Sequence, residues 1–291
     1  MLTRDQFREL LNNAPLILDG AMGSNLRQRG MPRGCCTEEW VLNHPETVME
    51  LQRRYYEAGA QVLYAPTFQA QPAALKEVRL DAQTEAINAM LVSLTKKAAP
   101  EALVAGDITT LAVHLDSFDP EVFHILVENY RRQIVGLLEG GADLLVAETL
   151  LYPQDAEAIL TAAELEGAET VMYTFTMQPD GSLFSGMDAG NVLRELEEAG
   201  AAAVGFNCVA ADMMMPYLVS KLRRQVRGPL ICKPNAGIPT IDDSGEAVYP
   251  MTPDEFAGIV SHCVDLGAKI VGGCCGTNPD FIRALREKIC K

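Results

Sequence analysis

The sequence predicts an α/β protein, a single closed (β/α)8 TIM barrel that takes in residues 1–291. Eight short apolar segments alternate with eight longer amphipathic ones, as expected when parallel strands are connected by helices. Most of the short segments show little alternation of polar and apolar residues, which indicates strands buried on both faces. No break in composition marks a domain boundary, so one barrel is favoured over a doubly wound open sheet.

The predicted strands are apolar runs of barrel-strand length. They are 16–19, 61–65, 103–107, 143–148, 170–176, 202–208, 230–233 and 269–272. In a barrel of this kind the carboxyl ends of all strands surround one mouth, where the active site lies. Residues that follow these segments directly are therefore the candidates for function.

The predicted helices lie between the strands, at 45–58, 82–97, 120–139, 153–165, 190–199, 211–224, 253–266 and 279–288. Several open with a proline in the first turn, a common helix start. Four end in a glycine step, at Gly59, Gly140-Gly141, Gly200 and Gly267, which fits a left-handed C-terminal cap. Two connections, 20–43 and 235–252, are long, and we expect the first to form a lid or loop over the mouth.

The composition is that of an ordinary globular protein, with 48% hydrophobic and 22% charged residues. The formal net charge is −15, from 39 acidic and 24 basic residues, and this field opposes binding to nucleic acid or anionic lipid. No apolar run approaches the roughly 20 residues of a membrane span. The first residues lack the basic and apolar regions of a signal peptide. We therefore expect a cytoplasmic protein with no nucleic-acid or membrane partner.

Three of the eight cysteines are placed as metal ligands would be. Cys274 and Cys275 follow the last strand between glycines, and Cys208 closes the strand 202–208. Adjacent side chains on a strand point to opposite faces, so two neighbouring thiols reach one ion only where glycine allows a sharp bend. Three thiolates with one open position are the ligand set of a catalytic zinc ion. Alternate strands contribute to the same layer of a barrel, so we expect the three thiols to converge.

The remaining cysteines are given no function. Cys232 and Cys263 are expected to pack in the core, while Cys290 and the pair Cys35-Cys36 are interpreted as incidental.

Polar residues gather at the predicted strand ends far more than chance would place them there. They are Asp19-Gly20, Thr67, Asp107, Glu148-Thr149, Asn207-Cys208, Asn235 and Cys274-Cys275. A different interpretation takes Gly272-Gly273 as the phosphate-binding loop of a lyase or isomerase barrel. That interpretation requires a catalytic lysine at a strand end, and Lys233 is the only candidate.

Five motifs resemble, in the same order, those of the homocysteine S-methyltransferase family. They are Leu18-Asp19-Gly20-Ala21-Met22-Gly23-Ser24, Glu148-Thr149, Gly205-Phe206-Asn207-Cys208, Pro234-Asn235-Ala236-Gly237 and Gly272-Gly273-Cys274-Cys275-Gly276-Thr277. The resemblance covers nearly the whole chain. It is closest to the homocysteine-binding barrel of the cobalamin-dependent methionine synthases and extends to betaine–homocysteine methyltransferases. The sequence departs from the family pattern at Pro66, in place of an asparagine, and at Gly106-Asp107, in place of a Gly-Pro pair.

The resemblance implies a substrate site beside the metal. It implies that Cys208, Cys274 and Cys275 bind zinc and that the homocysteine thiol takes the fourth position. It further implies that Asp19 and Glu148 hold the substrate ammonium, that N–H groups around Gly20, Ala21 and Met22 meet its carboxylate, and that Asn207 belongs to the same site. No side chain is assigned as a general base, because a metal-bound thiol is deprotonated by the metal.

The predicted reaction is zinc-dependent methyl transfer to homocysteine, giving methionine. No Asp-x-His-x-x-Gly cobalamin motif is present, so the expected donor is either a methyl-cobalamin protein acting in trans, which is preferred, or a small sulfonium or ammonium compound. The ending Gly276-Thr277-Asn278-Pro279 resembles that of the cobalamin-linked branch. Two alternatives stay open: direct transfer from S-methylmethionine or betaine, and a catalytically silent subunit that binds zinc or a thiol.

Overall fold

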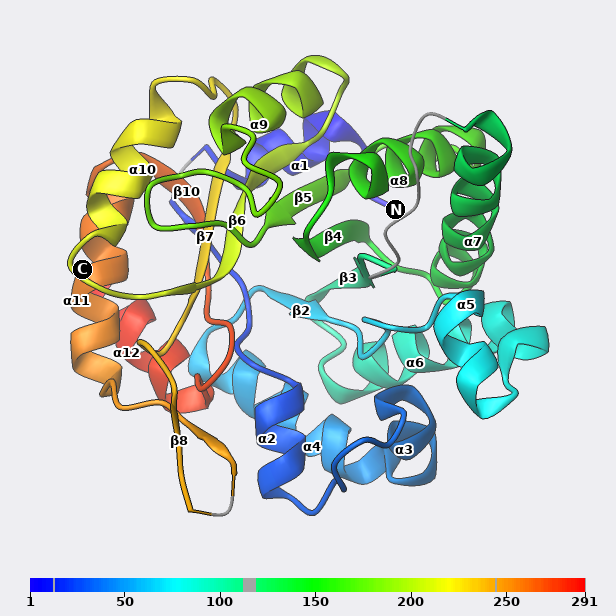
Figure 1. Cartoon of the computed structure of the whole chain (residues 1–291). Coiled ribbons are helices and arrows are strands. Elements are labelled where there is room, and N and C mark those ends of the chain that lie inside the picture. The colour runs from blue at the N-terminus through cyan, green and yellow to red at the C-terminus, as the bar shows by residue number, and fades with distance from the viewer. Residues whose placement is uncertain (13, 112–118, 244, 291) are drawn as a thin grey trace.

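Eight parallel strands form a barrel with helices around its outside (Figure 1). This computed structural model describes residues 1–12, 14–111, 119–243 and 245–290. The strand order is β1-β10-β7-β6-β5-β4-β3-β2. Leu18, just after β1, forms a parallel bridge with Val62 of β2, so the first and last strands of this order meet. The predicted TIM barrel is confirmed.

All eight predicted barrel strands are present, with ends shifted by a few residues. They are β1 (Leu16–Ile17), β2 (Val62–Tyr64), β3 (Leu103–Thr109), β4 (Leu144–Leu150), β5 (Val171–Phe175), β6 (Ala203–Ala210), β7 (Leu230–Asn235) and β10 (Ala268–Val271).

The eight predicted helices are also present. They are α4 (Pro45–Ala58), α6 (Thr84–Ala98), α7 (Pro120–Glu139), α8 (Pro153–Leu165), α9 (Ala189–Glu198), α10 (Met215–Arg223), α11 (Pro253–Asp265) and α12 (Pro279–Ile289). The predicted glycine caps are left-handed, with φ of 114° at Gly59, 84° at Gly141, 109° at Gly200 and 107° at Gly267.

Several short elements were not predicted from the sequence. They are α1 (Arg4–Leu10), α2 (Gly23–Gln28), α3 (Thr37–Asn43), α5 (Pro72–Leu75), the 3-10 turns η1 (Lys76–Val78) and η2 (Asp81–Gln83), and the hairpin of β8 (Thr240–Ile241) and β9 (Ala247–Val248). The segment 20–43, expected to be a lid or loop, thus contains two helices. Such short helices have few turns over which a periodic pattern can be recognised.

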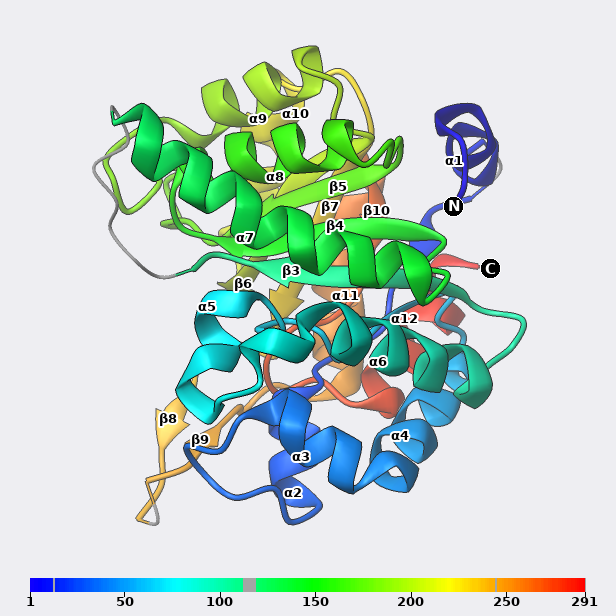
Figure 2. The ribbon, with the colours of Figure 1, turned by 90° about the vertical axis from the view of Figure 1, so that its right-hand side faces the viewer.

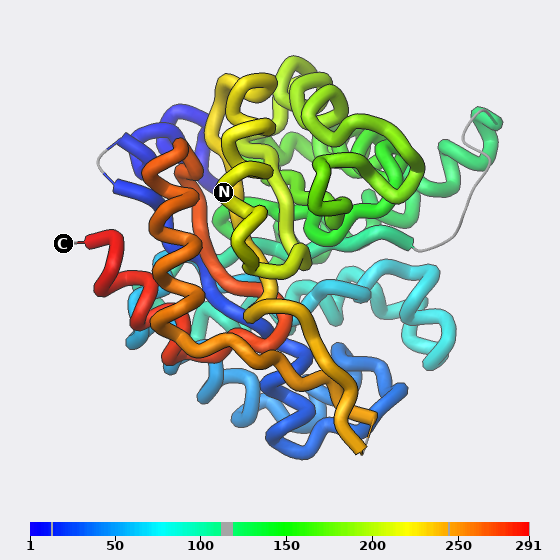
Figure 3. Tube along the Cα trace, turned by 60° about the vertical axis from the view of Figure 1, so that its left-hand side comes forward, coloured from blue at the N-terminus to red at the C-terminus, as the bar shows by residue number. Residues whose placement is uncertain are grey.

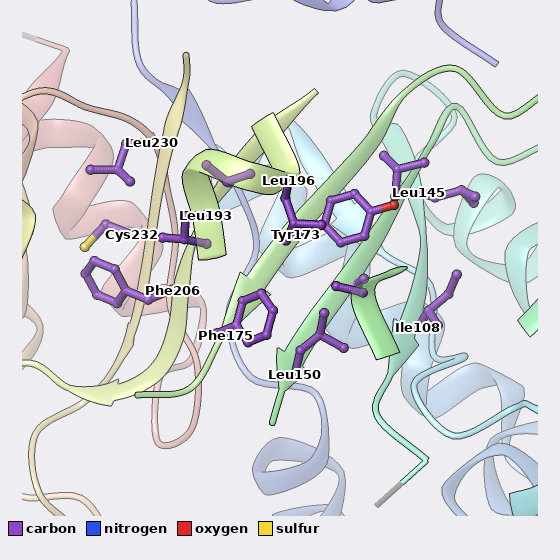
Figure 4. Packing of buried hydrophobic residues seen from close by; sticks show 14 of the residues in the cluster. Ile108, Leu145, Leu150, Tyr173, Phe175, Leu193, Leu196, Phe206, Leu230 and Cys232 are labelled. Carbon is purple, nitrogen blue, oxygen red and sulfur yellow. The ribbon is translucent and has the colours of Figure 1, made fainter. Parts of the chain in front are cut away.

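Outward-facing strand residues form the larger part of the core. Tyr173 and Phe175 of β5 and Phe206 of β6 pack with Leu193 and Leu196 of α9 (Figure 4). Cys232 and Cys263 are fully buried in the same layer, which confirms the expectation that they pack in the core.

Inward-facing residues form a separate apolar cluster inside the barrel. Met172 lies in this inner cluster although its neighbour Tyr173 lies in the outer one, as the two-residue period of a strand requires. Phe7 of α1 joins the inner cluster, and α1 lies at the end of the barrel opposite the β8–β9 hairpin (Figure 2). Helix α1 therefore covers the amino ends of the strands and leaves the other end open.

Two long connections lie side by side at the open end. The β8–β9 hairpin projects next to the segment that carries α2 and α3 (Figure 3). The carboxylate of Glu246 forms ion pairs with Arg27 and Arg33 of that segment. Among the helices of the described ranges, none combines the length and apolarity needed to cross a bilayer.

Candidate metal and substrate site

The inner face of the barrel changes from apolar to charged toward the mouth. On three strands an apolar residue of the inner cluster is followed two positions later by a charged one: Ala105 by Asp107, Val146 by Glu148 and Ile231 by Lys233. Because side chains two apart on a strand share a face, the three charged groups point toward the barrel axis. All three line one cavity of about 260 Å³.

The three predicted metal ligands converge at this cavity. The sulfur atoms of Cys208, Cys274 and Cys275 all lie within 4.8 Å of one another, and the group is the one cluster of potential metal ligands found among the described residues. The Sγ atoms of Cys208 and Cys275 are 3.9 Å apart. Tetrahedral coordination at a Zn–S distance of 2.3 Å requires sulfur atoms about 3.8 Å apart, so the arrangement fits a zinc ion.

The thiols influence one another strongly because they are so close. Hydrogen bonds from Cys208 and Cys274 lower the pKa of the Cys275 thiol to about 3. The pKa of Cys208 is raised far above its usual value, chiefly because its proton is shared with Cys274 and Cys275. The contacts within the cluster thus favour the thiolate at Cys275, the form that binds metals.

The ends of β4 and β6 are bent to present their side chains. Thr149 and Cys208 have left-handed backbones, with φ of 58° and 57°, a strain of about 1–3 kcal/mol each. Asn207 connects the two bends: its Oδ1 accepts a hydrogen bond from Thr149 N (2.8 Å), and its Nδ2 donates to Thr149 Oγ1 (2.7 Å) and to Glu148 Oε2 (3.2 Å). Asn207 thus holds the Cys208 turn and the Glu148 carboxylate in one arrangement.

The glycines around the cysteine pair are needed for close approach. A Cβ on Gly272 would lie 2.7 Å from Leu18 Cβ, which no side chain can tolerate. Gly276 has a φ of 81°. Backbone hydrogen bonds fix the turn between them, from Cys274 N to Pro234 O (2.7 Å) and from Ala236 N to Cys275 O (2.9 Å).

The segment 20–22 is attached to the same turn through Thr277. The Oγ1 of Thr277 accepts a hydrogen bond from Ala21 N (3.1 Å) and donates to Cys274 O (2.7 Å). Tyr55 OH donates to Ala21 O (2.8 Å), and a Cβ on Gly20 would lie 2.7 Å from both Tyr55 OH and Thr277 Oγ1. Neither Tyr55 nor the role of Thr277 was predicted, because Tyr55 and Ala21 are 34 positions apart and Ala21 and Thr277 are 256 apart.

Lys233 lies between the two carboxylates that the resemblance assigned to the substrate ammonium. Its Nζ is 3.5 Å from Glu148 Oε2 and 3.8 Å from Asp19 Oδ1, and it stands 4.5 Å from the centre of the Tyr64 ring. Asp19 Oδ2 also accepts a hydrogen bond from Tyr64 N (2.8 Å). The sequence analysis noted Lys233 only as a candidate for a lyase, and its pairing was missed.

Burial has the largest effect on the pKa values of Asp19 and Glu148. It raises the pKa of Asp19 to about 7, although Lys233 and the Tyr64 N–H act in the opposite direction. Burial likewise raises the pKa of Glu148 to about 7 against the effect of Lys233. Burial alone would lower the pKa of Lys233, but Glu148 and Asp19 outweigh it and hold that pKa well above its usual value. A protonated lysine cannot act as a nucleophile, which speaks against the lyase interpretation.

The cavity contains nearly every predicted site residue. Its wall includes Asp19, Gly20, Ala21, Met22, Glu148, Cys208, Cys274 and Cys275. Asn207 is fully buried behind it. Glu38 of α3, which the sequence analysis did not single out, also lines it and accepts a hydrogen bond from Gln69 N (2.7 Å). The cavity is smaller than the sites of drug-sized ligands and suits a small metabolite.

Three thiols converge beside a small charged cavity at the mouth of this barrel. These features define a class of barrel enzyme that binds a small substrate next to a metal site. A family model described as homocysteine S-methyltransferase matches residues 16–289. The chain belongs to this family.

Curated relatives and solved structures agree with this assignment. A methionine synthase of Mycobacterium leprae is 26% identical over 302 residues, which cover 97% of this chain and 25% of that protein. The Mycobacterium tuberculosis methionine synthase is 26% identical over 300 residues, with the same coverage. The chain thus spans about a quarter of the length of these relatives.

Similar solved structures match over their whole length. The metallated form of the Escherichia coli homocysteine methyltransferase MmuM superposes with a TM-score of 0.80 at 26% identity, covering 97% of this chain and 98% of that one. The oxidized form of the same protein gives a TM-score of 0.81 at 27% identity, covering 97% and 99%.

Proposed function

We propose that this protein transfers a methyl group to the thiol of homocysteine, giving methionine, with zinc held by Cys208, Cys274 and Cys275. The observation that carries the proposal is the convergence of three thiols beside a cavity with buried carboxylates. A zinc ion bound there would lower the pKa of an incoming thiol, so that the thiolate, the nucleophilic form, predominates at neutral pH.

The residues of the chain bind and orient the substrate in this proposal. Asp19 and Glu148 attract the ammonium group, and the N–H groups of the segment from Gly20 to Met22 approach the carboxylate. Asn207 orients Glu148 through the hydrogen bond to its Oε2. The cavity lies at the carboxyl ends of the strands, so the substrate sulfur would meet the donor at the mouth of the barrel. No side chain serves as a general base.

We further propose that the donor is a methyl-cobalamin protein acting in trans. Large apolar side chains are exposed on the connections after β5, β6 and β7 and on the first turn of α10, all on the mouth side: Phe184, Met187, Met213, Met214, Tyr217, Ile238, Ile241 and Val248. We call this set the apolar rim. Exposed apolar patches mark sites of protein contact, whereas a small donor such as S-methylmethionine or betaine needs none. In this proposal residues 1–291 act as one barrel domain in the cytoplasm, where the thiols stay reduced.

Zinc content and thiol binding test the site. The wild-type protein should hold zinc and release protons when homocysteine is added. Cys208→Ser should lose most of its zinc and most of the proton release. Cys290→Ser, which removes an exposed cysteine far from the cluster, is the matched control. A catalytically silent subunit would keep its fold and zinc but release no protons on addition of the thiol.

The donor is tested by an assay of methionine formation with three candidates: a methylated corrinoid protein, S-methylmethionine and betaine. Turnover with the corrinoid protein alone supports transfer in trans. Turnover with S-methylmethionine or betaine, but not with the corrinoid protein, would show that a small donor transfers its methyl group directly.

A further inference from the structure

Asp107 is an unpaired carboxylate in the wall of the cavity. It is only 5% exposed, and its Oδ1 is buried without a hydrogen-bond partner among the described residues. Its main chain is held firmly, because Thr67 Oγ1 accepts a hydrogen bond from Asp107 N (3.0 Å) and donates to Asp107 O (2.9 Å). Buried polar atoms are almost always paired in folded proteins, so a ligand is the natural source of the missing donor.

Two other acids of the cavity, Asp19 and Glu148, face Lys233, although Asp19 Oδ1 also lacks a hydrogen-bond partner among the described residues. Asp19 is bonded to Tyr64 N and faces Lys233, and Glu148 faces Lys233 and the Asn207 amide. Within the described part of the chain, Lys233 forms ion pairs with these two and none with Asp107. A single cation is therefore shared by Asp19 and Glu148, and Asp107 has no ion-pair partner among the described residues. Burial, and then the nearby Glu148, raise the pKa of Asp107 well above its usual value, and a bound cation would favour its charged form.

We propose that Asp107 is the residue that selects substrates carrying an α-ammonium group. The inference rests on the proposed methyl transfer and adds the specificity of the same site. The ammonium supplies the donor that Oδ1 lacks and a positive charge beside the acid that forms no ion pair with Lys233. Asp19 and Glu148 contribute to the negative field, while Lys233 holds them in place. Thiols without the amino group leave Asp107 unpaired and are disfavoured.

The test compares homocysteine with 4-mercaptobutyrate, which has the same carbon chain and thiol but no amino group. Binding to the zinc-loaded protein is measured by calorimetry. In the cobalt-substituted protein, the thiolate-to-cobalt absorption band reports that the sulfur of each ligand reaches the metal. Asp107→Asn keeps the shape of the side chain and removes its charge.

The wild-type protein should prefer homocysteine. Asp107→Asn should weaken homocysteine binding about 10- to 100-fold, as expected for one charge-assisted hydrogen bond, and leave 4-mercaptobutyrate binding and its cobalt band unchanged. The comparison variant is Glu39→Gln, because Glu39 is an exposed carboxylate of α3 that does not line the cavity. It should retain the preference for homocysteine.

The inference would be overturned, with the proposed function intact, if Asp107→Asn kept the wild-type ratio of the two affinities. This includes both unchanged binding and an equal loss of affinity for both thiols. If the wild-type protein binds neither thiol and shows no cobalt–thiolate band, the proposed function itself fails, and this inference with it.

Discussion

At the scale of single residues, the site depends on two backbone positions that ordinary residues avoid. Thr149 and Cys208 adopt left-handed conformations near the ends of β4 and β6, which lie on either side of β5, and the side chain of Asn207 spans the two. Strain of this kind persists only where surrounding contacts enforce it. Asn207 is therefore expected to stabilise both the fold and the metal ligand that follows it.

Replacing Asn207 with alanine should lower the free energy of unfolding by about 1–3 kcal/mol, because a buried polar group of Thr149 loses its partner. Zinc affinity should fall about 10- to 100-fold, since the positioning of Cys208 is lost. Urea unfolding and competition with a chelator measure the two effects. Asn191→Ala, at an exposed position of α9, should change neither. Unaltered zinc affinity in Asn207→Ala would show that Cys208 is positioned without it.

Lys233→Ala tests the cation between the carboxylates. Removing one partner of a buried ion pair costs about 3–5 kcal/mol, so stability should fall markedly. Methyl transfer should remain measurable, because Lys233 has no chemical role in the proposed reaction. A complete loss of methyl transfer, with fold and zinc content intact, would contradict the proposed assignment.

The preference for homocysteine over 4-mercaptobutyrate should depend on pH. Burial raises the pKa of Asp107, the residue inferred to select the ammonium, well above its usual value. It also raises the pKa of Asp19 and of Glu148 to about 7, so these two acids are increasingly neutral below that value. The attraction for the ammonium is therefore present above pH 7 and is lost as the pH falls through it. Calorimetry between about pH 5.5 and 8.5 measures the ratio of the two affinities, in which thiol deprotonation largely cancels. A constant ratio would show that neither acid titrates in this range.

At the scale of elements, the helices end where the sequence places glycine in a left-handed turn. Gly167 follows α8 with a φ of 70°, and a Cβ there would meet nothing within 4 Å. Gly258 lies inside α11, where a Cβ would also meet nothing within 4 Å. The two positions differ in backbone conformation and not in available space.

Alanine at these two positions should therefore have opposite effects. Gly167→Ala should destabilise the protein by about 1–2 kcal/mol because of its left-handed backbone. Gly258→Ala should stabilise it by about 0.5–1 kcal/mol because alanine favours the helix. Thermal unfolding of the two variants compares them directly. Effects of the same sign would mean that backbone conformation does not decide the outcome.

At the scale of the whole molecule, one end of the barrel is covered by a helix and the other end, the mouth, is open. Helix α1 packs against the amino ends of the strands, while the segment 20–43 and the β8–β9 hairpin flank the mouth and pair through Glu246. The apolar rim lies on the same side. A large donor can therefore approach the thiol site from one direction only.

Met213→Glu tests the apolar rim, since Met213 is 86% exposed on it. The charge should raise the KM for a methylated corrinoid protein about tenfold or more, and leave homocysteine binding unchanged. Leu165→Glu, at an exposed apolar position where α8 ends, is the control and should change neither value. An unaltered KM in Met213→Glu would exclude this surface as the docking site.

Much of the fold could be predicted because its signals are local. Helices α4, α7 and α8 begin at the prolines that indicated them, and α4 and α7 end at the predicted glycine steps. The short helices α2 and α3 could not be recognised, since their apolar residues are set by contacts with the rest of the barrel and not by a repeating pattern.

The sequence by itself determined the barrel and indicated which three cysteines converge at its mouth, because the strand period, the helix-ending glycines and the adjacent cysteines are patterns of only a few residues. Only the tertiary structure decided that Lys233 pairs with Asp19 and Glu148, that Thr277 braces the segment next to Asp19, and that Asp107 is left unpaired. These contacts join residues from different strands, so they depend on the register and closure of the sheet, which fix how side chains meet across the barrel axis.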